Sequence, residues 1–190
     1  QKMMEIGDEM IKLAVIADDL TGANDTALQF AKRNIHASVK MDLVHAMGDN
    51  RTGAAEVIVA DSDSRDLDAA QAYEKVYAIC TQMRALHPQS VFKKIDSTLR
   101  GNIGAEIRAA ADAFAPDLVV IAPAYPRIRR TTVGGHHLMD GIPLDLTEIA
   151  SAPKTPVHES YIPAILAKQA DNPVGVLDYQ TVHAGVAAIQ

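Results

Sequence analysis

A polar segment in the middle of the chain, residues 93–102 (KKIDSTLRGN), combines basic side chains, a carboxylate, two hydroxyls and a glycine. It follows a short apolar strand pattern and precedes a helical pattern that begins at Ile103. Such a junction lies at the carboxyl edge of a sheet, where polar side chains and the free N–H groups of the helix face the same space. The segment therefore predicts a site for an anionic small molecule. The alternative is an ordinary loop in which Asp96 and Ser97 cap the helix and the basic side chains are solvated.

A second polar cluster, residues 18–23 (DDLTGA), follows the first apolar run. Adjacent residues of an extended backbone point in opposite directions, so one of Asp18 and Asp19 is expected to face a given pocket. A carboxylate there could accept hydrogen bonds from substrate hydroxyls, or take the proton of a hydroxyl that attacks a phosphoryl group. In the structural alternative, the two aspartates cap the following helix or hold a basic neighbour. Haloacid-dehalogenase-type phosphatases also place aspartates after a first strand, but their second acid would stand where this chain has Leu20.

A third stretch, residues 127–137, is rich in arginine, threonine, glycine and histidine. Guanidinium groups match planar oxyanions and glycine lets the backbone approach a ligand, so the stretch could clamp a carboxylate or a phosphate. A surface hairpin with a turn at Asp140-Gly141 is the other interpretation. The adjacent histidines of this stretch lack the spacing of zinc motifs, so no metal site is predicted. The polar residues 61–65 (DSDSR) either line the same cleft or cap the next helix.

The elements that must position these clusters alternate between compact apolar runs and helical patterns. Strands are predicted at residues 12–17, 36–41, 56–60, 91–95 and 118–122, and helices at 21–33, 67–86 and 103–114. Because each strand is a continuous apolar run, the pattern predicts a doubly wound, mostly parallel α/β sheet with helices on both faces. Ligands of such sheets collect beyond the carboxyl ends of the strands, which is where the polar clusters lie.

The later part of the chain does not continue this alternation of strands and helices. The elements predicted there are a hairpin-like insertion around residues 126–145, a proline-containing loop at 151–155, a short helix at 162–170, a strand at 174–177 and a helix from Asp178 onward. We expect residues 1–11 to be a leader and residues 12–190 to form one domain. The last helix pattern has no closing cap, so the natural chain is expected to continue.

Composition restricts the class of protein. Of 190 residues, 48% are hydrophobic and 22% are charged, and the formal net charge is −6. Negative charge and scarce aromatic residues argue against a nucleic-acid partner. No apolar run approaches the roughly 20 residues of a membrane span and no signal-peptide pattern is present, so we expect a cytoplasmic protein with no membrane partner. Cys80, the single cysteine, is expected to be a buried thiol in a helix.

Three ordered motifs resemble those of the four-carbon acid sugar kinase family. They are VIADDLTGA at residues 15–23, KKIDSTLRGNIG at 93–104, and APAYP, RTTVGGHH and DGIPL within 122–144. The family phosphorylates threonate, erythronate and 3-oxo-tetronate with ATP. The resemblance implies that this chain is the N-terminal sugar-acid-binding domain of a two-domain enzyme, whose C-terminal nucleotide-binding domain holds ATP and Mg²⁺. The absence here of the GxxxxGK[ST] phosphate loop and of GxGxxG is consistent with this.

The resemblance also implies site residues. It places Asp18 or Asp19 against substrate hydroxyls, and our candidates for the catalytic proton acceptor are Asp18, Asp19 and Asp96. The residues expected to bind the sugar acid are Lys94, Ser97, Thr98, Arg100, Gly101, Arg130 and Thr131. The family pattern has glycine at the position of Arg129 and a polar residue at that of Gly134. No cofactor-binding or metal-binding residue is assigned in this chain.

Two other functions remain open at this stage. One is a stand-alone sugar-acid-binding or regulatory module without catalysis, and the other is a haloacid-dehalogenase-like phosphatase. Under the kinase interpretation, the chain alone is expected to be inactive, with a small sugar acid and the C-terminal domain as its partners. The sequence leaves open which stereoisomer is used, which hydroxyl is phosphorylated and whether the protein forms a homo-oligomer.

Overall fold

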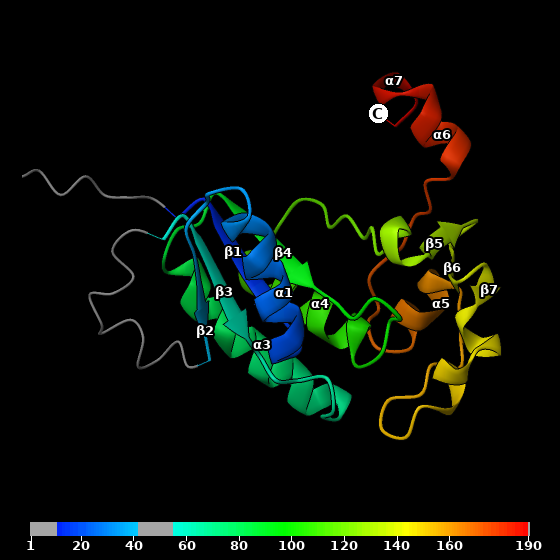
Figure 1. Cartoon of the computed structure of the whole chain (residues 1–190), viewed down its shortest axis with the longest axis horizontal. Coiled ribbons are helices and arrows are strands. Elements are labelled where there is room, and N and C mark those ends of the chain that lie inside the picture. Colours follow the sequence, from blue (N-terminus) through cyan, green and yellow to red (C-terminus); the bar gives the residue numbers. More distant parts are fainter. Residues whose placement is uncertain (1–10, 42–54, 190) are drawn as a thin grey trace, which may run out of the picture.

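The computed structural model describes residues 11–41 and 55–189, so most of the expected leader lies outside the described residues. Its main layer is a parallel sheet in the order β2-β3-β1-β4 (Figure 1). The strands are β1 (Leu13–Ala17), β2 (Ala37–Lys40), β3 (Val57–Asp61) and β4 (Ser90–Lys94). In register, Val15 of β1 lies opposite Val59 of β3 and Phe92 of β4. The loops that follow these three neighbouring strands therefore start from the same edge of the sheet.

Helices cover both faces of this sheet (Figure 1). On one face α1 (Leu20–Ala31) contributes Ala23 and Phe30 to a cluster with Val15. On the opposite face α3 (Ala69–Arg84) and α4 (Ile103–Phe114) pack together against Ile16. Because neighbouring residues of a strand point to opposite faces, a strand covered on both sides must be apolar throughout. This confirms the predicted parallel α/β architecture with helices on both faces.

The single cysteine is a structural residue. Cys80 is fully buried on α3, in the cluster that packs against the sheet, as its apolar neighbours in sequence predict. Burial raises the pKa of its thiol to about 12. The thiol is therefore protonated at neutral pH and inert.

A small antiparallel sheet in the order β5-β6-β7 lies beside α4 (Figure 1). It consists of β5 (Arg130–Val133), β6 (His136–Met139) and β7 (Ile142–Pro143), and α5 (Ile162–Ala167) packs with it around a shared apolar core. This confirms the hairpin-like insertion and the turn at Asp140-Gly141, where φ is 55° and 83°. Arg129 also has a positive φ, of 58°. Glycine adopts that conformation without strain, so the backbone here is one that suits the glycine that the resemblance leads us to expect.

Short elements complete the chain. They are η2 (Pro126–Ile128), η3 (Leu144–Leu146), η4 (Glu148–Ser151), α6 (Tyr179–Ala184) and α7 (Val186–Ile189). Gly185, with a φ of 92°, separates α6 from α7 where one continuous helix was predicted. Within the described part of the chain, no helix combines the length and the apolar character that a membrane crossing needs.

Two predicted strands are wrong. Residues 118–122 and 174–177 have no strand pairing, and Leu118 and Val120 are exposed. Both predictions rested on short apolar runs. An apolar run forms a strand only where a neighbouring strand accepts its backbone hydrogen bonds, and the sheet as described ends at β4.

Candidate active site

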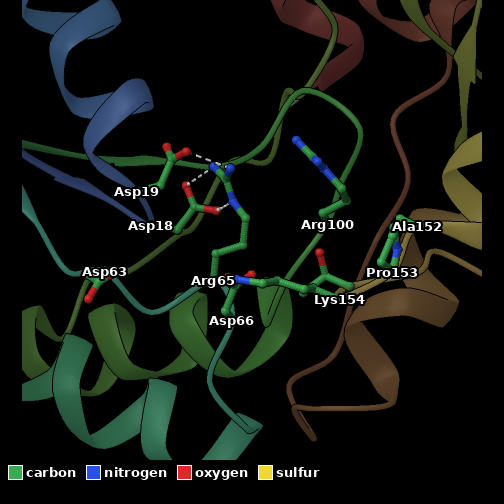
Figure 2. A pocket seen from close by; sticks show the side chains of 10 residues that line it. Asp18, Asp19, Asp63, Arg65, Asp66, Arg100, Ala152, Pro153 and Lys154 are labelled. Atoms are coloured by element: carbon green, nitrogen blue, oxygen red, sulfur yellow. Dashed lines mark hydrogen bonds and ion pairs between the residues drawn. The ribbon is translucent and has the colours of Figure 1, made fainter.

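Charged side chains from loops that are distant in sequence line a cavity of about 470 Å³ (Figure 2). Three of these loops follow β1, β3 and β4 at the carboxyl edge of the sheet, and the fourth joins η4 to α5. The lining residues are Asp18, Asp19, Asp63, Arg65, Asp66, Arg100, Ala152, Pro153, Lys154 and Thr155. The parallel topology thus brings together the polar clusters that follow the first, third and fourth strands, and it decides for residues 61–65 between the cleft and the helix cap that the sequence left open.

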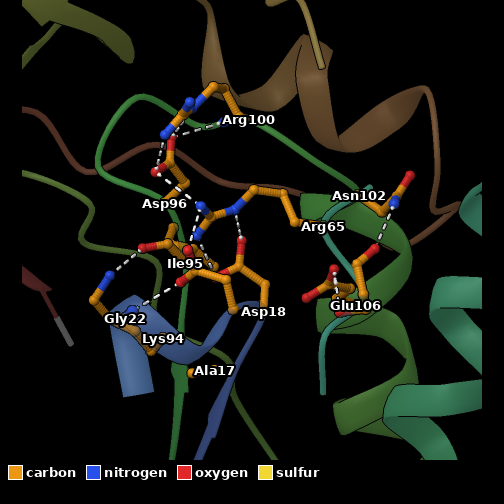
Figure 3. A network of polar contacts seen from close by, with 12 residues as sticks. Ala17, Asp18, Gly22, Arg65, Lys94, Ile95, Asp96, Arg100, Asn102 and Glu106 are labelled. Carbon is orange, nitrogen blue, oxygen red and sulfur yellow. Dashed lines mark hydrogen bonds and ion pairs between the residues drawn. The ribbon is translucent and has the colours of Figure 1, made fainter. Parts of the chain in front are cut away.

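Arg65 is the centre of an ion-pair network at this edge (Figure 3). Its Nε and Nη2 donate to the two carboxylate oxygens of Asp18 at 2.7 and 3.0 Å, and its Nη1 donates to Asp19 at 2.6 Å. Asp96 Oδ1 lies 3.8 Å from the same Nη1. Burial alone lowers the pKa of Arg65, but hydrogen bonds and charge from Asp18, with Asp96 and Asp19, raise it above its ordinary value. The guanidinium therefore stays charged and holds carboxylates from two strands together.

Of the three predicted aspartates, Asp19 is the one that a ligand can most readily reach. Its side chain is 27% exposed, against 2% for Asp18 and 9% for Asp96. Asp19 Oδ1 also accepts a hydrogen bond from the Gly22 N–H at 2.8 Å and so caps α1. A Cβ at Gly22 would lie 2.9 Å from this oxygen, so glycine leaves room for the cap. Asp19 thus combines the capping and cavity-facing roles between which the sequence left a choice, while Asp18 holds Arg65.

Asp96 organises the loop that follows β4. Its two oxygens accept hydrogen bonds from Arg100 Nε at 2.8 Å and Arg100 Nη2 at 2.9 Å, and Oδ2 also accepts one from the Thr98 hydroxyl. Burial raises the pKa of Asp96, but the hydrogen bonds from Arg100 and Thr98 outweigh it and hold the pKa well below its usual range. Arg100 in turn lines the cavity with a partly exposed guanidinium. The loop therefore presents a cation, held in place by a buried carboxylate.

Three residues predicted to bind the substrate are not among those that line the cavity. Lys94 Nζ donates to the carbonyl oxygen of Ile95 at 2.6 Å. This Nζ lies beside the start of α1, where a Cβ at Gly22 would be 3.5 Å from it. Thr98 is buried against Asp96. The carbonyl oxygen of Ser97 lies 3.1 Å from His137 Nε2. These contacts shape the loop, and direct binding of a ligand by the three residues stays a prediction.

The other three predicted binding residues divide between the loop and the hairpin. Gly101, with a φ of 90°, packs on Arg65, where a Cβ would lie 3.0 Å from the Cγ atom of that arginine. A side chain there would push Arg65 out of its network. Arg130 and Thr131 lie on β5, and Arg130 Nη1 is 3.6 Å from Asp140. Neither residue lines the cavity, so their role as ligands stays a prediction.

Four charged residues of the cavity were not among the predicted site residues. Asp63 and Arg65 belong to the polar stretch 61–65, which the sequence placed either at the cleft or at a helix cap, and Asp66 follows it directly. Lys154 lies in the proline-containing loop predicted at 151–155. The sequence feature that could have identified Arg65 as a cavity residue is its position shortly after a predicted strand. Nothing in the local sequence of Lys154 indicates that its loop meets the sheet edge.

His137 connects the hairpin to the loop after β4. Its ring is buried, with Nε2 facing the Ser97 carbonyl and Nδ1 3.1 Å from the Thr132 hydroxyl. Because a carbonyl can only accept, Nε2 carries the proton and Nδ1 accepts from the hydroxyl in the neutral ring. Burial lowers the pKa of His137. Within residues 11–41 and 55–189, no group of three or more His, Cys, Asp or Glu side chains could hold a metal ion.

The lowered pKa of His137 predicts a loss of stability in mild acid. A histidine whose pKa falls on folding binds more protons when unfolded, so its contribution is complete above the unfolded pKa of about 6.5 and declines below it. We expect the free energy of unfolding to fall between about pH 7 and pH 5, and His137→Gln to reduce that slope by up to about 1.4 kcal/mol per pH unit. Urea denaturation across this pH range measures it, with exposed His158→Gln as the control. An unchanged slope in His137→Gln would contradict the prediction.

Comparison with known proteins shows which proteins this chain resembles. The family model described as a sugar-binding N-terminal domain matches residues 13–190. A D-threonate kinase of Salmonella typhimurium is 43% identical over 176 residues, which cover 92% of this chain and 41% of the kinase. A D-erythronate kinase of Heliobacterium modesticaldum is 39% identical over 95% of this chain and 41% of its own length.

A solved structure from Bordetella bronchiseptica shares the fold. It is a domain-swapped dimer with bound citrate, and it matches with a TM-score of 0.79 and 38% identity over 82% of this chain and 40% of that chain. The chain spans about two fifths of the length of the relatives it matches. None of these relatives supports the phosphatase alternative or a regulatory module without catalysis.

Proposed function

The chain belongs to the sugar-binding N-terminal domain family, and we propose that it is the substrate-binding part of an ATP-dependent kinase of a four-carbon sugar acid. The observation that carries the proposal is the convergence of Asp19, Arg65 and Arg100, from loops after three neighbouring strands, on one cavity. The names of the relatives, D-threonate kinase and D-erythronate kinase, indicate the substrate class.

The chemistry of the cavity suits such a molecule. A four-carbon sugar acid offers one carboxylate and several hydroxyl groups, which require cations at one end and hydrogen-bond acceptors at the other. Arg100 supplies a partly exposed cation, and Asp19 supplies a partly exposed acceptor. The volume of about 470 Å³ lies within the range of small-molecule sites. The cavity can therefore hold the molecule and also fix its direction.

We place the proton acceptor of the reaction at Asp19. Of the three aspartates considered, it has the most accessible carboxylate and contacts a guanidinium through one oxygen, whereas Asp18 and Asp96 each hold a guanidinium through both oxygens. In phosphoryl transfer, most of the rate enhancement comes from positioning the attacking hydroxyl and stabilising charge. In this proposal the chain positions the attacking hydroxyl, through the network of ion pairs around Arg65.

ATP and Mg²⁺ belong, in this proposal, to the part of the longer protein outside the chain. The described residues offer no cluster that fits a metal ion, and the sequence has no phosphate-binding glycine loop. The C-terminal nucleotide-binding domain would supply both, and the chain alone would bind the sugar acid without phosphorylating it. A cytoplasmic location and the association of copies of the chain stay predictions.

Calorimetric titration of the folded chain with D-threonate, D-erythronate and 3-oxo-tetronate tests the proposal. We expect binding of at least one of them, and Arg100→Ala should weaken it by about 1.5–3 kcal/mol because a charge-assisted hydrogen bond is lost. Arg108→Ala, which removes an exposed arginine of α4, is the control and should leave the affinity unchanged. Absence of heat with all three acids would count against the function, and equal affinities of the two variants would remove Arg100 from the site.

A further inference from the structure

One wall of the cavity comes from outside the α/β sheet. Residues 152–155 line it, and they lie in the loop that joins η4 to α5 (Figure 2). On this loop, Lys154 Nζ lies 2.6 Å from Asp66 Oδ2, in the loop that follows β3. This ion pair therefore connects two sides of the cavity through residues 88 positions apart in sequence.

The cations of the cavity differ in how firmly carboxylates hold them. Arg65 forms a two-pronged contact with Asp18, and Arg100 forms one with Asp96. Lys154 has a single contact with Asp66, and the two side chains are 76% and 49% exposed. Water screens an exposed pair of this kind, so little energy opposes its separation. Lys154 is thus the cation of the cavity that a ligand carboxylate can most readily take over.

The charged groups differ between the two ends of the cavity, so a charged ligand has a preferred orientation in it. Figure 2 shows the guanidinium of Arg65 turned toward Asp18 and Asp19, with the Asp66–Lys154 pair beside the other end of its side chain. Asp18 and Asp19 repel an anionic group at one end, whereas Lys154 at the other end attracts it when the lysine separates from Asp66; the charge of Asp63 also acts on this lysine. The hydrogen bond and charge of Asp66 also raise the pKa of Lys154, which keeps the ammonium group charged.

We propose that Lys154 is a specificity-determining residue that binds the carboxylate of the sugar acid by exchanging Asp66 for the ligand. This rests on the function proposed above. With the carboxylate at Lys154, the hydroxyl groups of the acid extend toward Arg100 and Asp19 at the other end of the cavity (Figure 2). Binding also draws residues 152–155 onto the ligand, because the new ion pair replaces the one that connects the loop to Asp66.

The exchange makes a prediction that a merely structural ion pair does not. If Asp66 competes with the ligand for Lys154, then Asp66→Asn frees the lysine and tightens anion binding. If the pair only anchors the loop, then Asp66→Asn and Lys154→Met break the same contact and weaken binding alike. The opposite signs expected for the two variants therefore separate a ligand-binding lysine from an anchoring one.

Calorimetry with D-threonate and with citrate, as an independent anionic probe, compares the wild-type chain with Lys154→Met and Asp66→Asn. We expect Lys154→Met to weaken both probes about tenfold or more, and Asp66→Asn to tighten both about two- to fivefold. Lys12→Met is the matched control. It breaks another exposed ion pair, with Glu56, at the opposite end of β1 and should change neither affinity.

The outcomes distinguish the two proposals. Equal weakening by the Lys154 and Asp66 variants, or no change in either, would overturn the exchange while leaving the sugar-acid function intact. If citrate responds as expected but no tetronate binds the wild-type chain, the anion site at Lys154 stands and the proposed function fails. Circular dichroism of each variant confirms that the substitutions, all at exposed positions, leave the fold unchanged.

Discussion

Arg65→Ala is expected to lower the free energy of unfolding by about 3–5 kcal/mol and to abolish binding of sugar acids. The substitution leaves the buried carboxylate of Asp18 without the cation that satisfies both of its oxygens. Asp19 and Asp96 lose a positive neighbour at the same time. Removing one partner of a buried ion pair is strongly destabilising because the other charge stays behind without compensation. Urea denaturation followed by circular dichroism measures the loss, since the chain has no tryptophan.

Two further variants sharpen this test. Arg65→Lys keeps the charge, but one ammonium group cannot reproduce the fork that contacts both oxygens of Asp18 while reaching Asp19, so an intermediate loss is expected. Arg108→Ala removes an exposed arginine and should change the stability by less than about 0.5 kcal/mol. If Arg65→Ala were no more destabilising than Arg108→Ala, the network around Arg65 would not be what holds the sheet edge together.

The part of the site that could be predicted from sequence is the part set by the sheet. Asp18, Asp19 and Arg100 follow strands that read as buried apolar runs, and parallel strands end at one edge. Their convergence therefore follows from the strand pattern alone. Lys154 could not be placed in this way. Its loop reaches the cavity because the hairpin and α5 pack around a core shared with Ile103 of α4, and local sequence does not encode such a contact.

The structure also shows which contacts hold some of the residues that were predicted to bind the ligand. Lys93 and Lys94 are adjacent on β4 and therefore point to opposite faces of the sheet. Lys94 lies beside Gly22 at the start of α1, whereas Lys93 pairs with Glu106 on the face that α4 covers. Thr98 likewise contacts Asp96 rather than the cavity. A polar residue next to a binding loop is often used to hold that loop, and residue type does not distinguish the two uses.

The unpaired apolar runs show a different limit of predicting strands from sequence. Residues 118–122 have the composition of a buried strand, yet they have no strand partner and Leu118 and Val120 are exposed. Side-chain pattern reports which faces a segment can bury, whereas strand formation also requires a free edge at the correct distance. Helix α4 was predicted within its observed bounds because its hydrogen bonds are local to the segment.

A second large loss of folding stability is expected when the buried ion pair of Lys93 and Glu106 is broken. Lys93 Nζ lies 2.7 Å from Glu106 Oε2, and the side chains are only 9% and 2% exposed. Glu106 Oε1 accepts a hydrogen bond from the Ser64 hydroxyl, which in turn contacts Ser62, and Ser62 donates to the carbonyl oxygen of Ala17. Figure 3 shows Glu106 and Asn102 on the far side of Arg65 from Asp96. The pair thus connects β4 to α4, and the hydrogen bond from Ser64 connects Glu106 to the loop that carries Arg65.

Lys93→Met is expected to lower the free energy of unfolding by about 3–5 kcal/mol, because it leaves the charge of Glu106 buried without a partner. The double variant Lys93→Met/Glu106→Gln removes both charges and keeps an amide oxygen that can accept from Ser64. It should therefore regain most of the lost stability, since replacing both members of a buried ion pair by neutral groups is often close to neutral.

A double-mutant cycle by urea denaturation measures the coupling between the two positions. The matched cycle uses Lys12→Met and Glu56→Gln, an ion pair at the amino end of β1 whose exposure predicts no resolvable coupling. Strong coupling at Lys93 and Glu106 alone would show that burial, not the presence of opposite charges, makes the contact energetically important. Additive losses at Lys93 and Glu106 would instead mean that each side chain is solvated or compensated independently, and that the loop carrying Arg65 is held by its other hydrogen bonds.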